Sequence, residues 1–370
     1  QLAMLPRLKP ACFYDLVIEV AIVRPGPIQG DMVHPYLRRR QGLEPVTYPS
    51  EEVRAVLERT LGVPIFQEQV IKLAMVAAGF SAGEADRLRR SMAAWRRSGA
   101  LQQFEQRLID GMRERGYGKE FARRIWDQIQ GFGEYGFPES HSASFALLVY
   151  VSAWLKHYEP AAFLCALLNS QPMGFYAPAQ LVQDARRHKV AVRGVDVRCG
   201  DWESTLERTS SDNPVVRLGL HQVKGLSRAG GEQLVQARLH TAFITVDDLA
   251  RRACLSRKDL EALASAGALE GLSGHRHHAR WAVAGIETPL PLLEDTPPIE
   301  AEPLLRRPTE GEDIVADYAS LGLTLRRHPL ALLRARLNQS RYLSAEAVRG
   351  AANGKLVRTA GLGICRQHPS

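Results

Sequence analysis

Helical spacing of apolar residues dominates residues 1–195 of this chain and does most to limit the folds it can adopt. Six segments place apolar side chains three and four positions apart, which puts them on one face of a helix. Glycine and proline separate these segments. The segments are 53–61, 67–78, 82–95, 101–115, 119–130 and 142–158. We therefore predict a mainly α fold in which amphipathic helices pack around shared cores.

The pattern changes after residue 195 to shorter segments, which indicates further domains. Prolines and acids crowd residues 286–310, a composition typical of a linker. The predicted elements are a hairpin around 213–214, helices over 228–237, 246–252, 257–266 and 317–337, and a strand over 355–366. The predicted domains are 1–195, 196–285, a linker over 286–312, a helical segment over 313–353 and the start of a further domain over 354–370.

Composition narrows the class of protein. A net charge of +8 on 370 residues favours a polyanionic partner such as nucleic acid. The five cysteines stand singly, without the paired spacing of a zinc ribbon or a disulfide framework, which favours a reducing cytoplasm. The longest apolar run, over 143–155, is too short to span a bilayer, so we expect a buried helix and no membrane contact. The first residue is not methionine, and we interpret the chain as part of a larger protein.

Arginines gather on one face of the helix predicted over 82–95 and its continuation. They are Arg87, Arg89, Arg90, Arg96 and Arg97. The opposite face carries Leu88, Met92 and Trp95, and Ser81 with Glu84 has the spacing of a capping box. A guanidinium fork matches two phosphate oxygens, so the face suits a polyphosphate or a nucleic-acid backbone. A solvated helix face is the alternative.

A second candidate anion site lies at the glycine-rich join over 131–136. Ser140 is expected to cap the helix that begins near Ser142, and His141 lies beside its first amides. Exposed amides at a helix start can bind phosphate. A purely structural turn is the alternative for this segment.

Four ordered motifs resemble bacterial C-family DNA polymerases, the family of the DNA polymerase III alpha subunit. The motifs are Arg24-Pro25-Gly26-Pro27, Gln67-Glu68-Gln69-Val70, the segment 86–92, and the join from Tyr135-Gly136-Phe137 to Ser140-His141-Ser142. The segment 133–141 and Ala93-Ala94-Trp95 look most like the error-prone, damage-tolerant paralogue. The resemblance covers nearly the whole chain.

The resemblance implies that residues 1–195 form the polymerase fingers, which grip the incoming deoxynucleoside triphosphate. By matched motif, Arg89 and Arg90 would face the triphosphate, with Arg24 and His141 lining the same cleft. The family uses two Mg²⁺ ions held by palm aspartates. The Asp-x-Asp signature is absent here, and the resemblance places it before Gln1. The chain is therefore expected to contain no catalytic residue and no metal ligand, and to be inactive alone.

Residues 220–237 resemble a helix-hairpin-helix, a motif that points backbone amides at duplex phosphates. Lys224, Gly225, Ser227 and Arg228 are the candidate DNA-binding residues, with Ser227 standing where a second glycine is usual. A structural hairpin is the alternative. The second helix pair is interpreted as its packing partner, and the helices as a tandem helix-hairpin-helix domain.

Three further segments carry weaker signals. Residues 275–278 hold three histidines in a predicted solvated loop, without a metal assignment. Residues 288–293 lack the glutamine and the terminal aromatic of a clamp-binding peptide, so a sliding-clamp contact is not predicted. Residues 317–330 match the lead-in to the family's OB-fold, whose first strand would begin near Lys355 and whose barrel binds single-stranded template.

The sequence thus predicts part of an error-prone DNA-directed DNA polymerase that acts in translesion synthesis and repair. Its expected partners are primer-template DNA, deoxynucleoside triphosphates and, by resemblance alone, a Y-family-like accessory protein and a RecA-like factor. A replicative alpha subunit is one alternative. A non-enzymatic DNA-binding repair scaffold, in which the arginines grip only a backbone, is the other.

Overall fold

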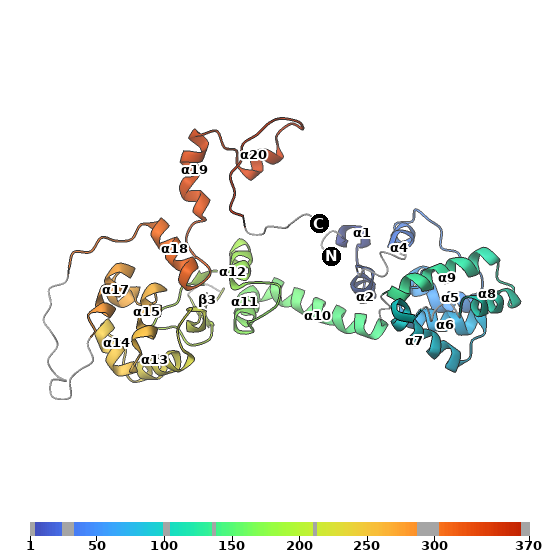
Figure 1. Cartoon of the computed structure of the whole chain (residues 1–370), viewed down its shortest axis with the longest axis horizontal. Helices are drawn as coiled ribbons and strands as arrows, with labels where there is room; N and C mark the ends of the chain where they lie inside the picture. Colours follow the sequence, from blue (N-terminus) through green and yellow to red (C-terminus); the bar gives the residue numbers. More distant parts are fainter. Residues whose placement is uncertain are drawn as a thin grey trace. The chain divides into compact units, whose positions relative to one another are not determined.

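The computed structural model describes residues 4–23, 33–98, 104–134, 138–209, 213–286 and 303–363. The chain divides into two compact units, residues 1–153 and 154–370, and the division falls within helix α10. The described elements of the first unit are α1 (Leu5–Leu8), α2 (Phe13–Ile22), α4 (Val33–Arg40), α5 (Glu51–Leu57), η1 (Glu58–Thr60), α6 (Gln67–Ala78), α7 (Ala82–Ser98), α8 (Glu105–Glu114), α9 (Lys119–Glu134) and most of α10 (Glu139–Tyr158) (Figure 1). The mainly α prediction is confirmed.

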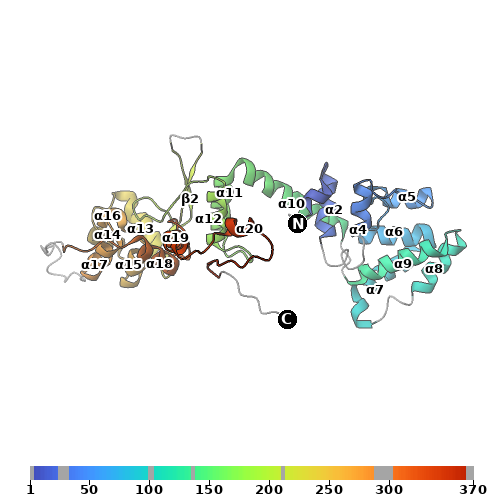
Figure 2. The same ribbon diagram turned by 90° about the horizontal axis from the view of Figure 1, so that it is seen from above.

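Helix α6 is the centre of the first unit. It packs against α5, α7 and α8, and both α7 and α8 pack against α9 (Figure 2). Its apolar face is fully buried, including Val70 and Leu73, as the sequence periodicity predicts. The Gln69 side chain fixes its start, because its oxygen accepts hydrogen bonds from two preceding amides and its nitrogen donates to Thr60 Oγ1 at 2.8 Å.

The second unit combines a small sheet with short helices. The sheet has the order β1-β3-β2, with β1 parallel and β2 antiparallel to β3. Its described elements are α11 (Pro160–Asn169), α12 (Pro178–Arg187), β1 (Val192–Arg193), β2 (Thr205–Glu207), β3 (Val215–Arg217), η3 (Leu220–Gln222), α13 (Arg228–His240), α14 (Val246–Ala253), α15 (Arg257–Ser265), α16 (Glu270–Ser273), α17 (Arg276–Ala284), α18 (Glu310–Ser320), α19 (Pro329–Gln339) and α20 (Ala345–Arg349). A core shared by the sheet and α11–α17 holds this unit together.

Two predicted elements of the second half differ in the structure. The helix predicted over 317–337 is split into α18 and α19, because the chain turns at Gly322 with a positive φ of 75°. The strand predicted over 355–366 is not formed within its described part, where Thr359 makes a single bridge to Leu343. The antiparallel hairpin of β2 and β3 confirms the one predicted around residue 213. The start of an OB-fold and the domain boundaries stay predictions.

Helix α10 departs most from expectation. Its apolar run was predicted to be buried, yet only Ser142 and Ala146 of this helix are buried. The other residues of this helix are exposed or half-buried. Among the described residues, no helix is both long enough and apolar enough to cross a membrane.

Candidate functional site

The arginine helix α7 is fixed by its cap and its apolar face. Ser81 Oγ accepts a hydrogen bond from the Glu84 amide at 3.3 Å, and Glu84 accepts one from the Ser81 amide at 2.8 Å, which confirms the predicted capping box. Ala85 and Leu88 are completely buried against the core of the first unit. The next arginines along the helix are therefore held on its outer face.

Arg89 and Arg90 both engage one carboxylate, that of Asp86. Arg89 donates from Nε at 3.1 Å and from Nη2 at 2.9 Å to one oxygen of Asp86, and Arg90 donates from Nε at 2.8 Å and from Nη2 to the other. These bonds, first those of Arg90 and then those of Arg89, hold the pKa of Asp86 below its usual range. The two arginine side chains are 47% and 71% exposed, so both remain accessible to solvent while they hold Asp86.

The remaining arginines of α7 have less defined roles. Arg87 is exposed on the same helix. The side chains of residues 92–98, and with them Met92, Trp95, Arg96 and Arg97, lie outside the described residues.

The first residue of α10, Glu139, makes hydrogen bonds to side chains of the first unit through both its amide and its carboxylate. The Glu139 amide donates to Glu68 Oε2 at 2.9 Å, and the Glu139 carboxylate accepts a hydrogen bond from the Tyr14 hydroxyl at 2.7 Å. Burial, with that hydrogen bond, raises the pKa of Tyr14 far above its usual value. The helix begins at Glu139, so Ser140 lies inside its first turn and is not the cap that the sequence predicts. The predicted anion site at these amides is thus partly filled by Glu68.

His141 lies on the first turn of α10, exposed, with its ring 4.6 Å from the ring of Phe145. Helix α6 supports both parts of the predicted nucleotide site, because it packs against α7 and its Glu68 holds the start of α10. The described contacts do not join His141 to Arg89 or Arg90. Arg24 and residues 135–137 lie outside the described residues, and α9 extends through the glycines predicted to form a loop at 131–133.

The helix-hairpin-helix turn lies between η3 and α13. Gly225 has φ of 87°, a conformation that favours glycine, and it is exposed. Lys224 is bound to the end of α18: its amide donates to the Ser320 carbonyl at 2.8 Å and its ammonium donates to the Tyr318 carbonyl at 3.2 Å. One hairpin amide that could meet a phosphate therefore already has a protein partner.

Ser227 replaces the usual glycine for a structural reason. Its hydroxyl caps α13 by accepting a hydrogen bond from the Gly230 amide at 3.0 Å. Its own amide donates to Asp259 Oδ1 at 2.7 Å, and Asp259 also accepts from the Ser256 hydroxyl at 2.6 Å. Asp259 thus joins the starts of α13 and α15. Arg228 beside it is exposed and paired with Glu232 at 2.8 Å.

Replacing Asp259 with alanine is expected to destabilise the second unit by about 1–3 kcal/mol, because its buried carboxylate no longer accepts hydrogen bonds from the starts of α13 and α15. Burial alone would raise the pKa of Asp259, but hydrogen bonds from Ser227 and Ser256 outweigh it and hold the pKa below its usual range. The stabilisation is complete above the unfolded pKa, near 4, and is lost as the pH falls through the lower folded pKa. Urea denaturation at pH 7 and at lower pH measures both effects. Glu232→Ala is the control, and an equal loss in both variants would contradict this role.

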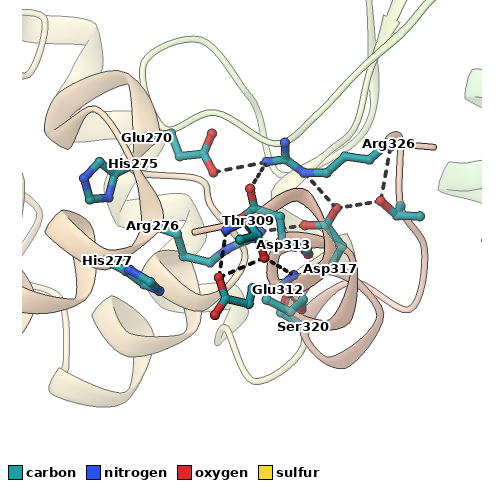
Figure 3. A network of polar contacts seen from close by, with 12 residues as sticks. Glu270, His275, Arg276, His277, Thr309, Glu312, Asp313, Asp317, Ser320 and Arg326 are labelled. Carbon is teal, nitrogen blue, oxygen red and sulfur yellow. Dashed lines mark hydrogen bonds and ion pairs between the residues drawn. The ribbon is translucent and has the colours of Figure 1, made fainter. Parts of the chain in front are cut away.

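A buried ion-pair cluster, which the sequence did not predict, attaches α18 to α17 (Figure 3). Arg276 is 3% exposed and donates to Asp313 at 2.5 Å and to Asp317 at 2.6 Å. Arg326 lies within 3.0 Å of Asp313, and the Thr324 hydroxyl donates to Asp317 at 2.7 Å. The cluster bridges the two sides of the predicted linker, so α18 packs with the helix-hairpin-helix domain.

The histidines at 275–278 start a helix and do not form the predicted loop. His275 caps α17 by accepting a hydrogen bond from the His278 amide at 3.3 Å, and His277 Nδ1 lies 2.7 Å from the Arg306 carbonyl oxygen. Across the described part of the chain, no group of three or more His, Cys, Asp or Glu residues is arranged to hold a metal ion.

Comparison with known proteins identifies the domain types of two parts of the chain. Residues 1–116 match the model of the bacterial DNA polymerase III alpha subunit finger domain, and residues 189–279 match the helix-hairpin-helix motif. The chain belongs to the bacterial C-family of DNA polymerases, as its ordered motifs predict.

Several relatives are similar to this chain over its whole length. The whole chain is 61% identical to a protein of Methylococcus capsulatus and 64% identical to one of Alkalilimnicola ehrlichii. A Pseudomonas aeruginosa protein is 57% identical over the same full coverage. All three carry the name error-prone DNA polymerase. The chain spans 36–37% of the length of these relatives.

Proposed function

We propose that this chain supplies the nucleotide-binding fingers and the duplex-binding helix-hairpin-helix of an error-prone DNA polymerase. The whole protein would transfer nucleotides to a primer across damaged template in the cytoplasm, in translesion synthesis and DNA repair. The observation that carries the proposal is the pair of exposed guanidinium forks on α7, in the part of the chain that matches the finger domain.

The chemistry of α7 suits a triphosphate. Each fork of Arg89 and Arg90 holds an oxygen of Asp86, and phosphate oxygens can replace the carboxylate oxygens without a change in the helix. Because the anion replaces an internal carboxylate, the two positive charges need not be held unpaired before it arrives. Arg24 and His141 are proposed by resemblance as further residues of the same cleft.

The two Mg²⁺ ions of nucleotidyl transfer are proposed to bind outside this chain. In the part of the chain that the structure describes, the acidic residues do not gather into a metal site. The adjacent pair Asp247-Asp248 begins α14, where each carboxylate lies near an arginine one turn later, Asp247 within 2.7 Å of Arg251.

Duplex DNA is proposed to meet the exposed side of the hairpin at Gly225 and Arg228, with Ser227 fixing the turn. Lys224 would exchange its contact with the Tyr318 carbonyl for a backbone phosphate. Such contacts position a duplex without reading its sequence.

Replacing Lys224 with alanine is expected to lower the slope of log affinity for duplex DNA against log salt by about one, because one phosphate contact is lost. Arg228→Ala is expected to act in the same way. Titration of a fluorescent duplex at several salt concentrations measures the slope. Arg54→Ala, an exposed arginine of α5 with two acidic neighbours, is the control. An unchanged slope for both hairpin variants would contradict the assignment.

Two rival functions make different predictions. A replicative alpha subunit would share both sites but would copy undamaged template with higher fidelity. A DNA-binding repair scaffold would use Arg89 and Arg90 for backbone alone and would not bind nucleotides. A Y-family-like accessory protein and a RecA-like factor are proposed as partners from the resemblance, and a sliding-clamp contact is not proposed.

A further inference from the structure

A small cavity lies within the second unit, where α18 packs on the helix-hairpin-helix domain. It has a volume of about 170 Å³, and we call it the α18 cavity. Four charged side chains of the ion-pair cluster line it, and most of the remaining wall is apolar. A mostly apolar cavity with a few polar groups is the usual form of a small-molecule site. The apolar wall includes Val195, Leu218, Leu321, Leu323 and Leu325.

Two polar groups at the α18 cavity have no hydrogen-bond partner among the described residues. Arg276 is 3% exposed, and its Nε–H has no acceptor, although its two terminal nitrogens hold Asp313 and Asp317. Glu270 Oε1 lies 3.7 Å from Arg326 Nη2, beyond hydrogen-bond distance (Figure 3). A Cβ at Gly267 would come within 2.9 Å of both Arg276 Nη2 and Glu270 Oε1, so the two groups face a space that glycine leaves open.

The charges of the cluster define what the cavity can accept. Three carboxylates, of Glu270, Asp313 and Asp317, meet two guanidinium groups, of Arg276 and Arg326. Arg276 donates hydrogen bonds to both aspartates, which leaves Glu270 as the carboxylate without a donor. Burial raises the pKa of Glu270, although both arginines oppose the shift. A fitting ligand therefore donates hydrogen bonds to Glu270 and accepts one from Arg276, and a simple anion does not fit.

We infer that the α18 cavity binds a guanine base, from a free nucleotide or from an unpaired position of a nucleic-acid strand. The Watson–Crick edge of guanine carries two adjacent donors, the N2 amino group and N1–H, followed by the O6 acceptor. The two donors would pair with Glu270, and O6 would accept from Arg276 Nε, with the ring among the apolar side chains. Adenine places an acceptor where Glu270 needs a donor. This site is separate from the arginine forks of α7 and goes beyond the proposed function.

Calorimetric titration of the full chain with nucleosides tests the inference, because nucleosides have no phosphate to engage Arg89 and Arg90. We expect guanosine to bind with a dissociation constant below about 1 mM. Inosine, which lacks the 2-amino group, is expected to bind about tenfold more weakly, and adenosine should show no measurable binding. Equal binding of guanosine and adenosine, or no binding of guanosine, would overturn the inference.

Glu270→Gln is the matching variant, and it is expected to weaken guanosine binding at least about tenfold, because the charge-assisted hydrogen bonds are lost. Glu261→Gln removes a carboxylate that is 61% exposed on α15 and should leave the affinity unchanged. Thermal denaturation checks that both variants fold. A crystal structure of the unsubstituted chain with guanosine needs no variant, and ordered water alone in the cavity would count against the site.

Competition experiments separate the two sources of the base. Displacement of guanosine by a thymidine oligonucleotide that contains one guanine would assign the cavity to an unpaired base of a strand. Displacement by guanosine monophosphate and not by the oligonucleotide would assign it to a free nucleotide. If neither displaces guanosine, the inference is wrong. Binding of deoxynucleoside triphosphates at Arg89 and Arg90 is measured separately, so the proposed function and this inference can each fail alone.

Discussion

Replacing Arg89 or Arg90 with alanine is expected to weaken deoxynucleoside triphosphate binding by on the order of 1.5–3 kcal/mol each, the contribution of charge-assisted hydrogen bonds. Each arginine presents an Nε–H and Nη–H fork that now holds one oxygen of Asp86. The loss corresponds to roughly 10- to 150-fold in the dissociation constant. Nucleotide titration of the full-length polymerase on a primer-template measures it.

Arg87→Ala provides a matched control, because this residue lies on the same helix, carries the same charge and is exposed. Its nucleotide affinity is expected to change little, and duplex affinity should stay nearly constant in all three variants. If Arg89→Ala and Arg90→Ala instead weaken duplex binding while nucleotide affinity is unchanged, the scaffold function replaces the proposed one. If Arg87→Ala weakens nucleotide binding equally, the affinity comes from the positive charge of the helix as a whole and not from specific hydrogen bonds of Arg89 and Arg90.

Sequence patterns within one or two helical turns correctly predicted helices and caps that are stabilised by neighbouring residues in the sequence. The periodicity of residues 67–78 gives the bounds of α6, and the Ser81 and Glu84 spacing gives the cap of α7, because each signal depends on neighbours within one or two helical turns. The exposed arginines next to Leu88 follow from the same periodicity.

Contacts between residues far apart in the chain could not be predicted from the sequence. The apolar run of α10 correctly indicates a helix, but the burial expected of it is wrong in the described structure, where only Ser142 and Ala146 of this helix are buried. Lys224 has the position and charge of a phosphate-binding residue, yet its partners Tyr318 and Ser320 lie more than ninety residues later in the chain. Ser227 weakens the match to the hairpin motif in the sequence, but in the structure its amide and its hydroxyl both donate hydrogen bonds to Asp259, which lies 32 residues later.

Replacing Arg276 with alanine is expected to destabilise the second unit by about 3–5 kcal/mol, because it leaves two buried carboxylates without their main counter-charge. Asp313 and Asp317 each lie within 2.6 Å of an Arg276 nitrogen, and Arg326, which is 35% exposed, is their remaining cation. Among the residues described, these two ion pairs of Arg276 are the buried charged contacts between α17 and α18. Urea denaturation of the full chain measures the loss, and proteolysis near residues 303–309 is expected to become faster as α18 detaches.

A companion variant separates the ion pairs from simple packing. Arg276→Met combined with Asp313→Asn and Asp317→Asn removes the charges on both sides and is expected to recover most of the stability, because the free energy lost in Arg276→Ala comes mainly from the unpaired carboxylates. Arg228→Ala, which breaks an exposed pair on α13, is the surface control and should change stability little. A triple variant as unstable as Arg276→Ala would mean that the arginine stabilises the unit through its shape and contacts. Full recovery would mean that the charges add no net stability beyond that of a neutral packed contact, and α18 with its hydrogen bonds to Lys224 should then stay in place.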